Sequence, residues 1–244
     1  MALFKIFFAL IRLPFAFLSG GGSQNEARAR YRAGVKLQRR GQLEEAVGEY
    51  SRAIELDPGY YQAYSNRGAA YHLLGKPELT VRDLDEAIRL RPSLAVGYSN
   101  RGMAYSSMGD YKRAIQDLNA AVQLNPKFPD FYSSRGYLHN MMGRRRHAIR
   151  DLDQAIRLAP KFAEAYNNRA DVYMALNQAE QAISDLDEAI MLDRNFAIAY
   201  VNRALAWTML GKDTEAGRDV DLAASLGIDR SIVMEKIEEL KAKR

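Results

Sequence analysis

The sequence predicts an all-α solenoid of six helix–turn–helix repeats followed by a capping helix. Two observations lead to this prediction. A shift of 34 residues superposes the sequence on itself from residue 27 to residue 230, without insertion or deletion. Aromatic, small and Pro residues also recur at fixed positions of that period. A unit of this length is too short for a separate globular domain but sufficient for a pair of helices. The recurring sets are Tyr64, Tyr98, Tyr132, Tyr166 and Tyr200; Gly68, Gly102, Gly136, Ala170 and Ala204; Ala46, Thr80, Ala114, Ala148, Ala182 and Ala216; Ala53, Ala87, Ala121, Ala155, Ala189 and Ala223; and Pro58, Pro92, Pro126 and Pro160.

The period and the order of these residues resemble the tetratricopeptide repeat (TPR) family. The resemblance implies a right-handed solenoid with a concave groove. It covers the expected repeats 27–60, 61–94, 95–128, 129–162, 163–196 and 197–230. Residues 231–244 have one apolar and one charged face and are expected to form the capping helix, with Ser231 as a plausible N-cap.

Within a repeat, a first helix (helix A) and a second helix (helix B) should meet at a tight turn. In the third repeat, we expect helices at about 96–108 and 111–124, with Gly109 left-handed between them. Gly102 should let the two helices approach closely, beside Tyr105 and Leu118. The residues expected to share the conformation of Gly109 are Gly75, Gly143, Asn177 and Gly211.

Arg and Asp recur together in five of the six repeats and suggest charge-assisted hydrogen bonds between helices. The first repeat has Ala33 and Glu49 at these positions instead. An Arg ladder that binds phosphate is a less favoured interpretation, because each Arg has a carboxylate within reach. The bonds could form within a repeat or between repeats. The recurring arginines are Arg67, Arg101, Arg135, Arg169 and Arg203, and the recurring aspartates are Asp83, Asp117, Asp151, Asp185 and Asp219.

Asparagine directly precedes most of these arginines. The TPR resemblance places this position of helix A in the concave groove. The pattern is similar to the asparagine ladder of the TPR superhelix of O-linked N-acetylglucosamine transferase, which implies binding of an extended peptide backbone. The alternative is that the amides bridge helices inside the solenoid. Neighbouring Met and aromatic residues would add adaptable apolar contacts. The expected groove residues are Asn66, Asn100, Ser134, Asn168, Asn202, Met103, Tyr137, Asn140 and Met174.

Other binding and catalytic chemistries lack their motifs. The chain has no cysteine, and His72, His139 and His147 are separated without metal-ligand spacing, so we expect no catalytic site, metal, cofactor or small-molecule substrate. The carboxylate clamp of chaperone-binding TPRs is disfavoured, because Tyr31, Val35 and Val96 occupy clamp positions. The basic cluster 144–147 lacks interleaved aromatic residues, so no nucleic acid is expected.

Residues 1–18 form the only long apolar run outside the repeats, and we expect them to be a membrane anchor. A signal-anchor helix, a cleaved signal peptide and a helix packed on the first repeat remain alternatives. Residues 19–26 should form a Gly/Ser linker. Six basic residues follow between 28 and 40, which favours a repeat domain that faces the cytoplasm over a secreted or periplasmic one. The expected anchor residues are Phe4, Lys5, Phe7, Phe8, Ile11, Arg12 and Phe15.

These observations together predict a non-catalytic, membrane-tethered adaptor that binds a protein or peptide partner in its groove and acts in assembly or recruitment of a complex. The net charge of +5 also allows an acidic partner. The alternative is a structural accessory subunit of a membrane complex, docked through its N-terminal helix.

Overall fold

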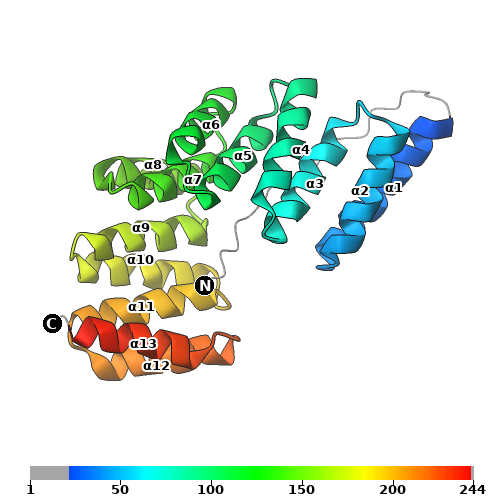
Figure 1. The fold of residues 1–244 in the computed structure, drawn as a ribbon. Coiled ribbons are helices and arrows are strands. Elements are labelled where there is room, and N and C mark those ends of the chain that lie inside the picture. Colours follow the sequence, from blue (N-terminus) through cyan, green and yellow to red (C-terminus); the bar gives the residue numbers. More distant parts are fainter. Residues whose placement is uncertain (1–21, 243–244) are drawn as a thin grey trace. The chain divides into compact units, whose positions relative to one another are not determined.

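The computed structural model describes residues 22–242, and within that range the chain is entirely helical outside its turns, which confirms the predicted all-α solenoid. Figure 1 shows the helices as successive antiparallel pairs. In order along the chain they are α1 (Gly22–Arg39), α2 (Leu43–Leu56), α3 (Tyr61–Leu73), α4 (Pro77–Leu90), α5 (Ala95–Ser107), α6 (Tyr111–Leu124), α7 (Pro129–Met141), α8 (Arg145–Leu158), α9 (Ala163–Ala175), α10 (Ala179–Leu192), α11 (Ala197–Met209), α12 (Asp213–Ser225) and α13 (Arg230–Lys241).

The described helices divide into two compact units, α1–α6 and α7–α13. Within each unit, the two helices of a repeat pack together, and each helix B also packs on helix A of the next repeat. Helices A of successive repeats are neighbours as well, α1 with α3 and α3 with α5 in the first unit, and α7 with α9 and α9 with α11 in the second. Odd-numbered helices therefore line one face of each unit.

The turns between helices A and B have the predicted left-handed backbone. Gly109 has a φ of 78°, and Asn177, which takes the same place in the fifth repeat, has a φ of 56°. Asparagine tolerates this conformation better than most residues with a side chain. Pro77 begins α4, where its missing N–H leaves no intrahelical hydrogen bond unmade.

Close approach of the two helices in a repeat depends on a small residue in helix A. A Cβ added to Gly102 would lie 3.0 Å from the backbone oxygen of Ala114 and 3.2 Å from Cγ of Leu118. At Gly136 the added atom would lie only 2.8 Å from Cγ of Leu152. Leu118 and Leu152 are fully buried, so neither can move aside without disturbing the core.

The predicted capping helix is present as α13, which packs on α11 and α12 and buries Val233 and Ile237. The prediction that Ser231 is its N-cap is wrong. The N-cap is Asp229, whose carboxylate accepts hydrogen bonds from the backbone N–H of Ser231 at 2.9 Å and from its hydroxyl at 2.7 Å. An ionised carboxylate at this position also interacts favourably with the positive end of the helix dipole.

The expected anchor residues 1–18 lie outside the described residues. Helix α1 begins at Gly22, so residues 22–26 of the expected linker are helical. Across residues 22–242, the structure contains no helix with the length and apolar character needed to cross a bilayer.

Candidate functional site

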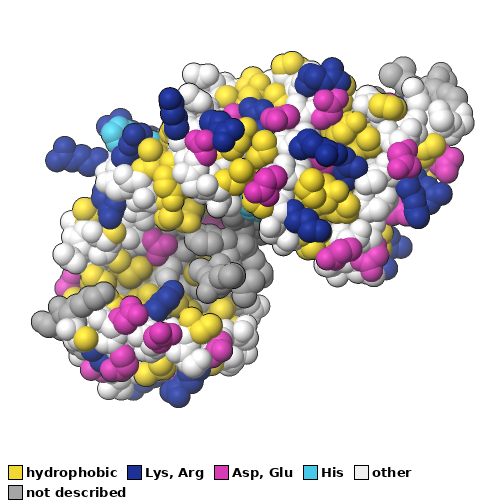
Figure 2. All heavy atoms as spheres, viewed as in Figure 1, with side chains coloured by type: hydrophobic (Ala, Val, Ile, Leu, Met, Phe, Trp, Pro, Cys, Tyr) yellow, Lys and Arg dark blue, Asp and Glu magenta, His cyan; other side chains and the backbone are white. Residues whose placement is uncertain are grey.

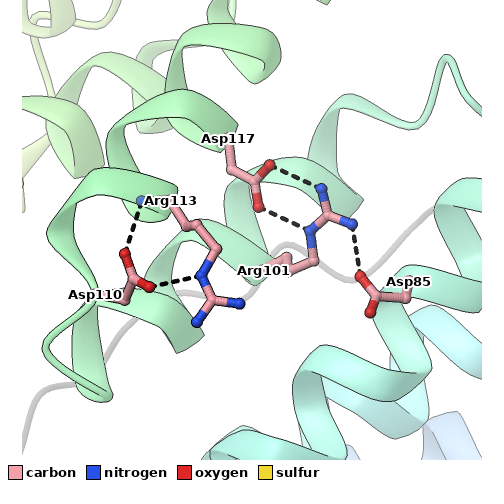
Figure 3. A network of polar contacts seen from close by, with 5 residues as sticks. All are labelled: Asp85, Arg101, Asp110, Arg113 and Asp117. Carbon is pink, nitrogen blue, oxygen red and sulfur yellow. Dashed lines mark hydrogen bonds and ion pairs between the residues drawn. The ribbon is translucent and has the colours of Figure 1, made fainter.

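Arginine residues of helix A bind aspartates of helix B, as the sequence predicted, and the structure places both partners of each bidentate pair in the same repeat. Arg101 donates from Nε and Nη2 to the two carboxylate oxygens of Asp117, both at 2.8 Å (Figure 3). The same bidentate geometry recurs at Arg67 with Asp83, Arg135 with Asp151, Arg169 with Asp185 and Arg203 with Asp219. These aspartates are all buried, which makes the paired carboxylate part of the core rather than a ligand site.

Several of these arginines also reach the preceding repeat. Nη1 of Arg101 donates to Asp85 of α4 at 2.6 Å, so one guanidinium joins two repeats (Figure 3). Equivalent bonds join Arg169 to Asp153 and Arg203 to Asp187, both at 2.6 Å. The hydrogen bonds to Asp117 and Asp85 raise the pKa of Arg101. Because each guanidinium is already bound by a carboxylate, we assign these arginines a structural role and not a role in ligand binding.

The predicted groove asparagines bridge neighbouring A helices in three of the four cases. In each bridge, Nδ2 donates to a side chain located 35 residues earlier, on the preceding helix A. The bonds are Asn66 to the Tyr31 hydroxyl at 2.9 Å, Asn168 to the Ser133 hydroxyl at 3.1 Å, and Asn202 to Oδ1 of Asn167 at 2.9 Å.

Asn100 differs from these three. Its side chain is 5% exposed, and its Nδ2 has no hydrogen-bond partner among the described residues. A buried amide that lacks a partner costs roughly 1–3 kcal/mol. Asn66 is also buried, at 1% exposed, and Met103 beside Asn100 is 5% exposed. The expected groove residues of the first unit are therefore largely enclosed by the solenoid itself.

In the second unit the expected groove residues keep part of their surface. They lie on the three neighbouring A helices α7, α9 and α11, and none of them falls in the buried class. These partly exposed residues are Ser134, Tyr137, Asn140, Asn168, Met174 and Asn202. The helix-A face of the second unit can therefore offer an amide oxygen, a hydroxyl, an aromatic ring and a thioether to a partner.

Asp171 belongs to this face and was missed by sequence reasoning. Nδ2 of Asn202 donates to its Oδ1 at 2.8 Å. Burial raises the pKa of Asp171 to about 7, and Lys236 of the capping helix lowers it in part. The available signal was its phase, because Met103 and Tyr137 occupy the same position in the third and fourth repeats. Its carboxylate fixes the side-chain amide of Asn202 on this face.

The three histidines are not assembled into a metal centre. His139 is buried, at 8% exposed, and its ring centroid is 5.2 Å from that of His147. Nε2 of His139 lies 3.8 Å from Asp151. In the part of the chain that the structure describes, no three His, Cys, Asp or Glu side chains are grouped as a metal site. The exposed Arg144 and Arg146 lie at the turn before α8 and in its first turn.

Family models of the tetratricopeptide repeat match residues 37–75, 61–94, 95–128 and 163–196. No curated protein sequence matches the chain. Solved structures resemble it in fold at low sequence identity. The APC/C hetero-tetramer Cut9–Hcn1 superposes with a TM-score of 0.79 at 18% identity, over 87% of this chain and 43% of that chain. A tetratricopeptide repeat protein from Parabacteroides merdae gives 0.74 at 22% identity, over 88% and 84%.

A third fold likeness extends along the whole of the other protein. Pseudomonas aeruginosa PilF superposes with a TM-score of 0.72 at 18% identity, over 92% of this chain and 100% of that chain. At these identities the likenesses establish the solenoid architecture, which the repeat period and the helix pairs also show.

Proposed function

Because this chain belongs to the tetratricopeptide repeat family, whose repeats indicate a protein-interaction scaffold, we propose that it is a non-catalytic adaptor that binds an extended segment of a protein partner. The binding surface is the helix-A face of the second unit, formed by α7, α9 and α11. The observation that carries this proposal is the partial exposure of all six expected groove residues on that face, compared with the buried Asn66, Asn100 and Met103 of the first unit.

The chemistry of this face suits an extended backbone. Because Nδ2 of Asn168 and of Asn202 donates within the solenoid, the amide oxygens are the groups that remain for a partner N–H. The Ser134 hydroxyl can donate to a backbone carbonyl. Tyr137 and Met174 add apolar surface that adapts to different side chains. Contacts to the partner's backbone supply affinity that does not depend on the partner's sequence. The apolar contacts supply a preference among its side chains.

The adaptor is tethered to a membrane by residues 1–18, with its repeats facing the cytoplasm. Two sequence features support this part of the proposal. The segment is the chain's only long apolar run outside the repeats, and a run of basic residues follows it. A tethered scaffold would hold its partner at the membrane, which suits the assembly or recruitment of a complex.

The test compares two matched double variants of the full chain. Y137A/M174A removes one tyrosine and one methionine from the helix-A face of the second unit. Y111A/M191A removes the same two residue types from helices B, α6 and α10. A partner is first identified by crosslinking from a photoreactive residue placed at position 140, and its affinity is then measured in solution. The groove variant should bind at least tenfold more weakly, while the control binds as the unaltered chain does.

Two results would reject the proposal. One is equal affinity of both double variants, with helicity confirmed by circular dichroism. The other is loss of the partner on deletion of residues 1–18 in detergent solution, together with indifference to Y137A/M174A. That second pattern is the one expected of a structural subunit docked through its N-terminal helix.

A further inference from the structure

Helix α1 carries a basic stripe along the side that faces away from the core. Arg32, Lys36 and Arg39 lie four and three residues apart, which places them on one side of the helix. The exposed members are Arg32, Lys36, Arg39 and Arg40, the last at the turn that follows α1. Figure 2 shows Lys and Arg side chains on the surface of α1 and α2. Among the described residues, no carboxylate forms an ion pair with Lys36, Arg39 or Arg40.

In every later repeat the residue that corresponds to Lys36 is buried and uncharged. Lys36 corresponds to Ala70, Ala104, Leu138, Val172 and Ala206, which are all fully buried. Arg32 corresponds to Asn66 and Asn100, which are buried, and to Ser134, Asn168 and Asn202, which are partly exposed; all five are uncharged. In α1 these positions are instead exposed and cationic. Because a neutral polar residue would solvate the surface equally well, solvation alone does not explain an exclusively cationic stripe.

The positive charge of the whole protein is concentrated in this region. The first 40 residues hold eight Lys and Arg against one Glu, whereas the remaining residues hold 27 Lys and Arg against 29 Asp and Glu. The capping helix α13 provides a contrast within the same chain. It solvates its exposed side with both signs of charge, Glu235, Lys236, Glu238, Glu239 and Lys241. The single sign of charge along the stripe therefore points to an anionic ligand surface.

We propose that the stripe Arg32, Lys36, Arg39 and Arg40 binds the anionic headgroups of a phospholipid bilayer, so that α1 rests on the membrane surface. The inference rests on the proposed tethering of residues 1–18. Only residues 19–21 separate that segment from the start of α1. A tether this short holds the stripe within reach of the headgroups, because three residues span at most about 11 Å.

The chemistry favours a bilayer over a nucleic acid. The stripe carries guanidinium and ammonium groups with no aromatic side chain among them, whereas single-stranded nucleic acids are usually bound by stacking of their bases on aromatic rings. A flat array of headgroups matches cations spread along one side of a helix. Near such a surface each Lys or Arg strengthens binding by about fivefold at physiological salt.

The experiment measures sedimentation of the full chain with two kinds of vesicle. One kind is phosphatidylcholine alone, and the other contains one part of phosphatidylglycerol to two of phosphatidylcholine. K36Q/R39Q/R40Q removes three charges from the stripe. R144Q/R146Q/R150Q is the matched control, since it removes three exposed charges from the fourth repeat. A variant lacking residues 1–18 tests the tether separately.

The unaltered chain should bind the anionic vesicles more tightly than the neutral ones, by roughly tenfold to a hundredfold, and added salt should reduce that preference. K36Q/R39Q/R40Q should lose most of the preference and keep its binding to neutral vesicles, while the control retains both. Equal binding of the unaltered chain to both kinds of vesicle would overturn the inference about the stripe but would not contradict the tethering proposal. An equal loss in both triple variants would also overturn it, because the effect would then follow net charge alone.

The tether and the stripe can fail independently. If the variant lacking residues 1–18 binds neutral vesicles as well as the full chain does, the tethering proposal is wrong. If that variant keeps a preference for anionic vesicles that K36Q/R39Q/R40Q abolishes, the stripe is still supported.

Discussion

Arg101 and Asp117 form a bidentate pair between the two helices of the third repeat, with both N–H···O distances at 2.8 Å. Asp117 is 7% exposed, so removing either partner leaves a poorly hydrated charge in the core. The arrangement is present in five repeats and joins helix A to helix B at equivalent positions of each repeat. Each of these five repeats should therefore be stabilised by its own Arg–Asp pair.

D117A and R101A should each lower the free energy of unfolding by about 1–3 kcal/mol, because each leaves its partner unsatisfied. The double variant should lose less than the sum of the two, since no unpaired charge then remains. Urea unfolding of the four proteins measures the interaction energy. Strict additivity here and at a second pair, Arg169 with Asp185, would contradict the structural role.

The bond from Arg101 to the preceding repeat should matter less. The side chain of Asp85 is 53% exposed, so water screens its interaction with Arg101. We expect D85N to cost about 0.2–1 kcal/mol and to lose its effect in high salt, whereas D117N should be more damaging and less sensitive to salt. Unfolding at two salt concentrations measures both. A larger cost for D85N than for D117N would show that the link between repeats is the stronger one.

Two helical glycines offer a matched test of helix approach. A Cβ at Gly136 would lie 2.8 Å from Cγ of buried Leu152, whereas a Cβ at Gly217 would have no atom within 4 Å. G136A should therefore destabilise the protein by about 1–3 kcal/mol through overpacking. G217A should stabilise it by about 0.5–1 kcal/mol, because alanine loses less conformational entropy in a helix. Thermal unfolding of both variants provides the comparison, and equal shifts would contradict the packing argument.

His139 should make stability depend on pH. Burial is the main cause that lowers its pKa below 6.5, helped by His147, Arg135 and Arg144 and opposed by Asp151. In the unfolded chain the imidazole takes up a proton near pH 6.5, so the stability from the neutral buried ring is complete above that pH and declines as pH falls toward the native-state pKa.

Replacing His139 with the tyrosine found at this position in other repeats should reduce the pH dependence below 6.5 without removing it, because burial also lowers the pKa of His72, to about 4. H147Q is the control, because it removes an exposed histidine from the same helix pair. Urea midpoints of the unaltered chain, H139Y and H147Q between pH 5 and 7.5 supply the measurement. An unchanged slope in H139Y would assign the pH dependence to other groups.

Most of the fold followed from the sequence because the period fixes the phase of every residue. The two helices predicted in the third repeat match α5 and α6 to within a residue at each end. The left-handed Asn177 was predicted as well, since its place in the period is otherwise held by glycine. The N-cap of α13 was missed because that helix lies beyond the last repeat, where no neighbouring copy shows that Asp229 precedes the first turn.

The candidate site was less predictable, because its exposure depends on pairs of positions in different repeats. Asn66 donates to Tyr31, which lies 35 residues earlier on the preceding helix A, and burial of Asn66 removes its amide from the groove. Asn202 has a second acceptor in Asp171, at a repeat position where no other repeat has an acidic residue. The helix phase gives the face on which a side chain lies, but the side chains of the adjoining repeat decide whether a partner can reach it.

The final prediction separates the two units as binding surfaces. Asn168 and Asn202 keep part of their surface, whereas Asn66 and Asn100 are 1% and 5% exposed. N168A/N202A should therefore weaken partner binding by roughly 1–3 kcal/mol, at about 0.5–1.5 kcal/mol for each hydrogen bond. N66A/N100A should leave the affinity nearly unchanged, although N66A loses the bond to Tyr31 and should unfold at lower urea. Isothermal titration with the partner that crosslinking identified, together with circular dichroism of each variant, tests both statements. Wild-type affinity in N168A/N202A would remove the asparagines from the binding surface, and a loss confined to N66A/N100A would place the partner on the first unit.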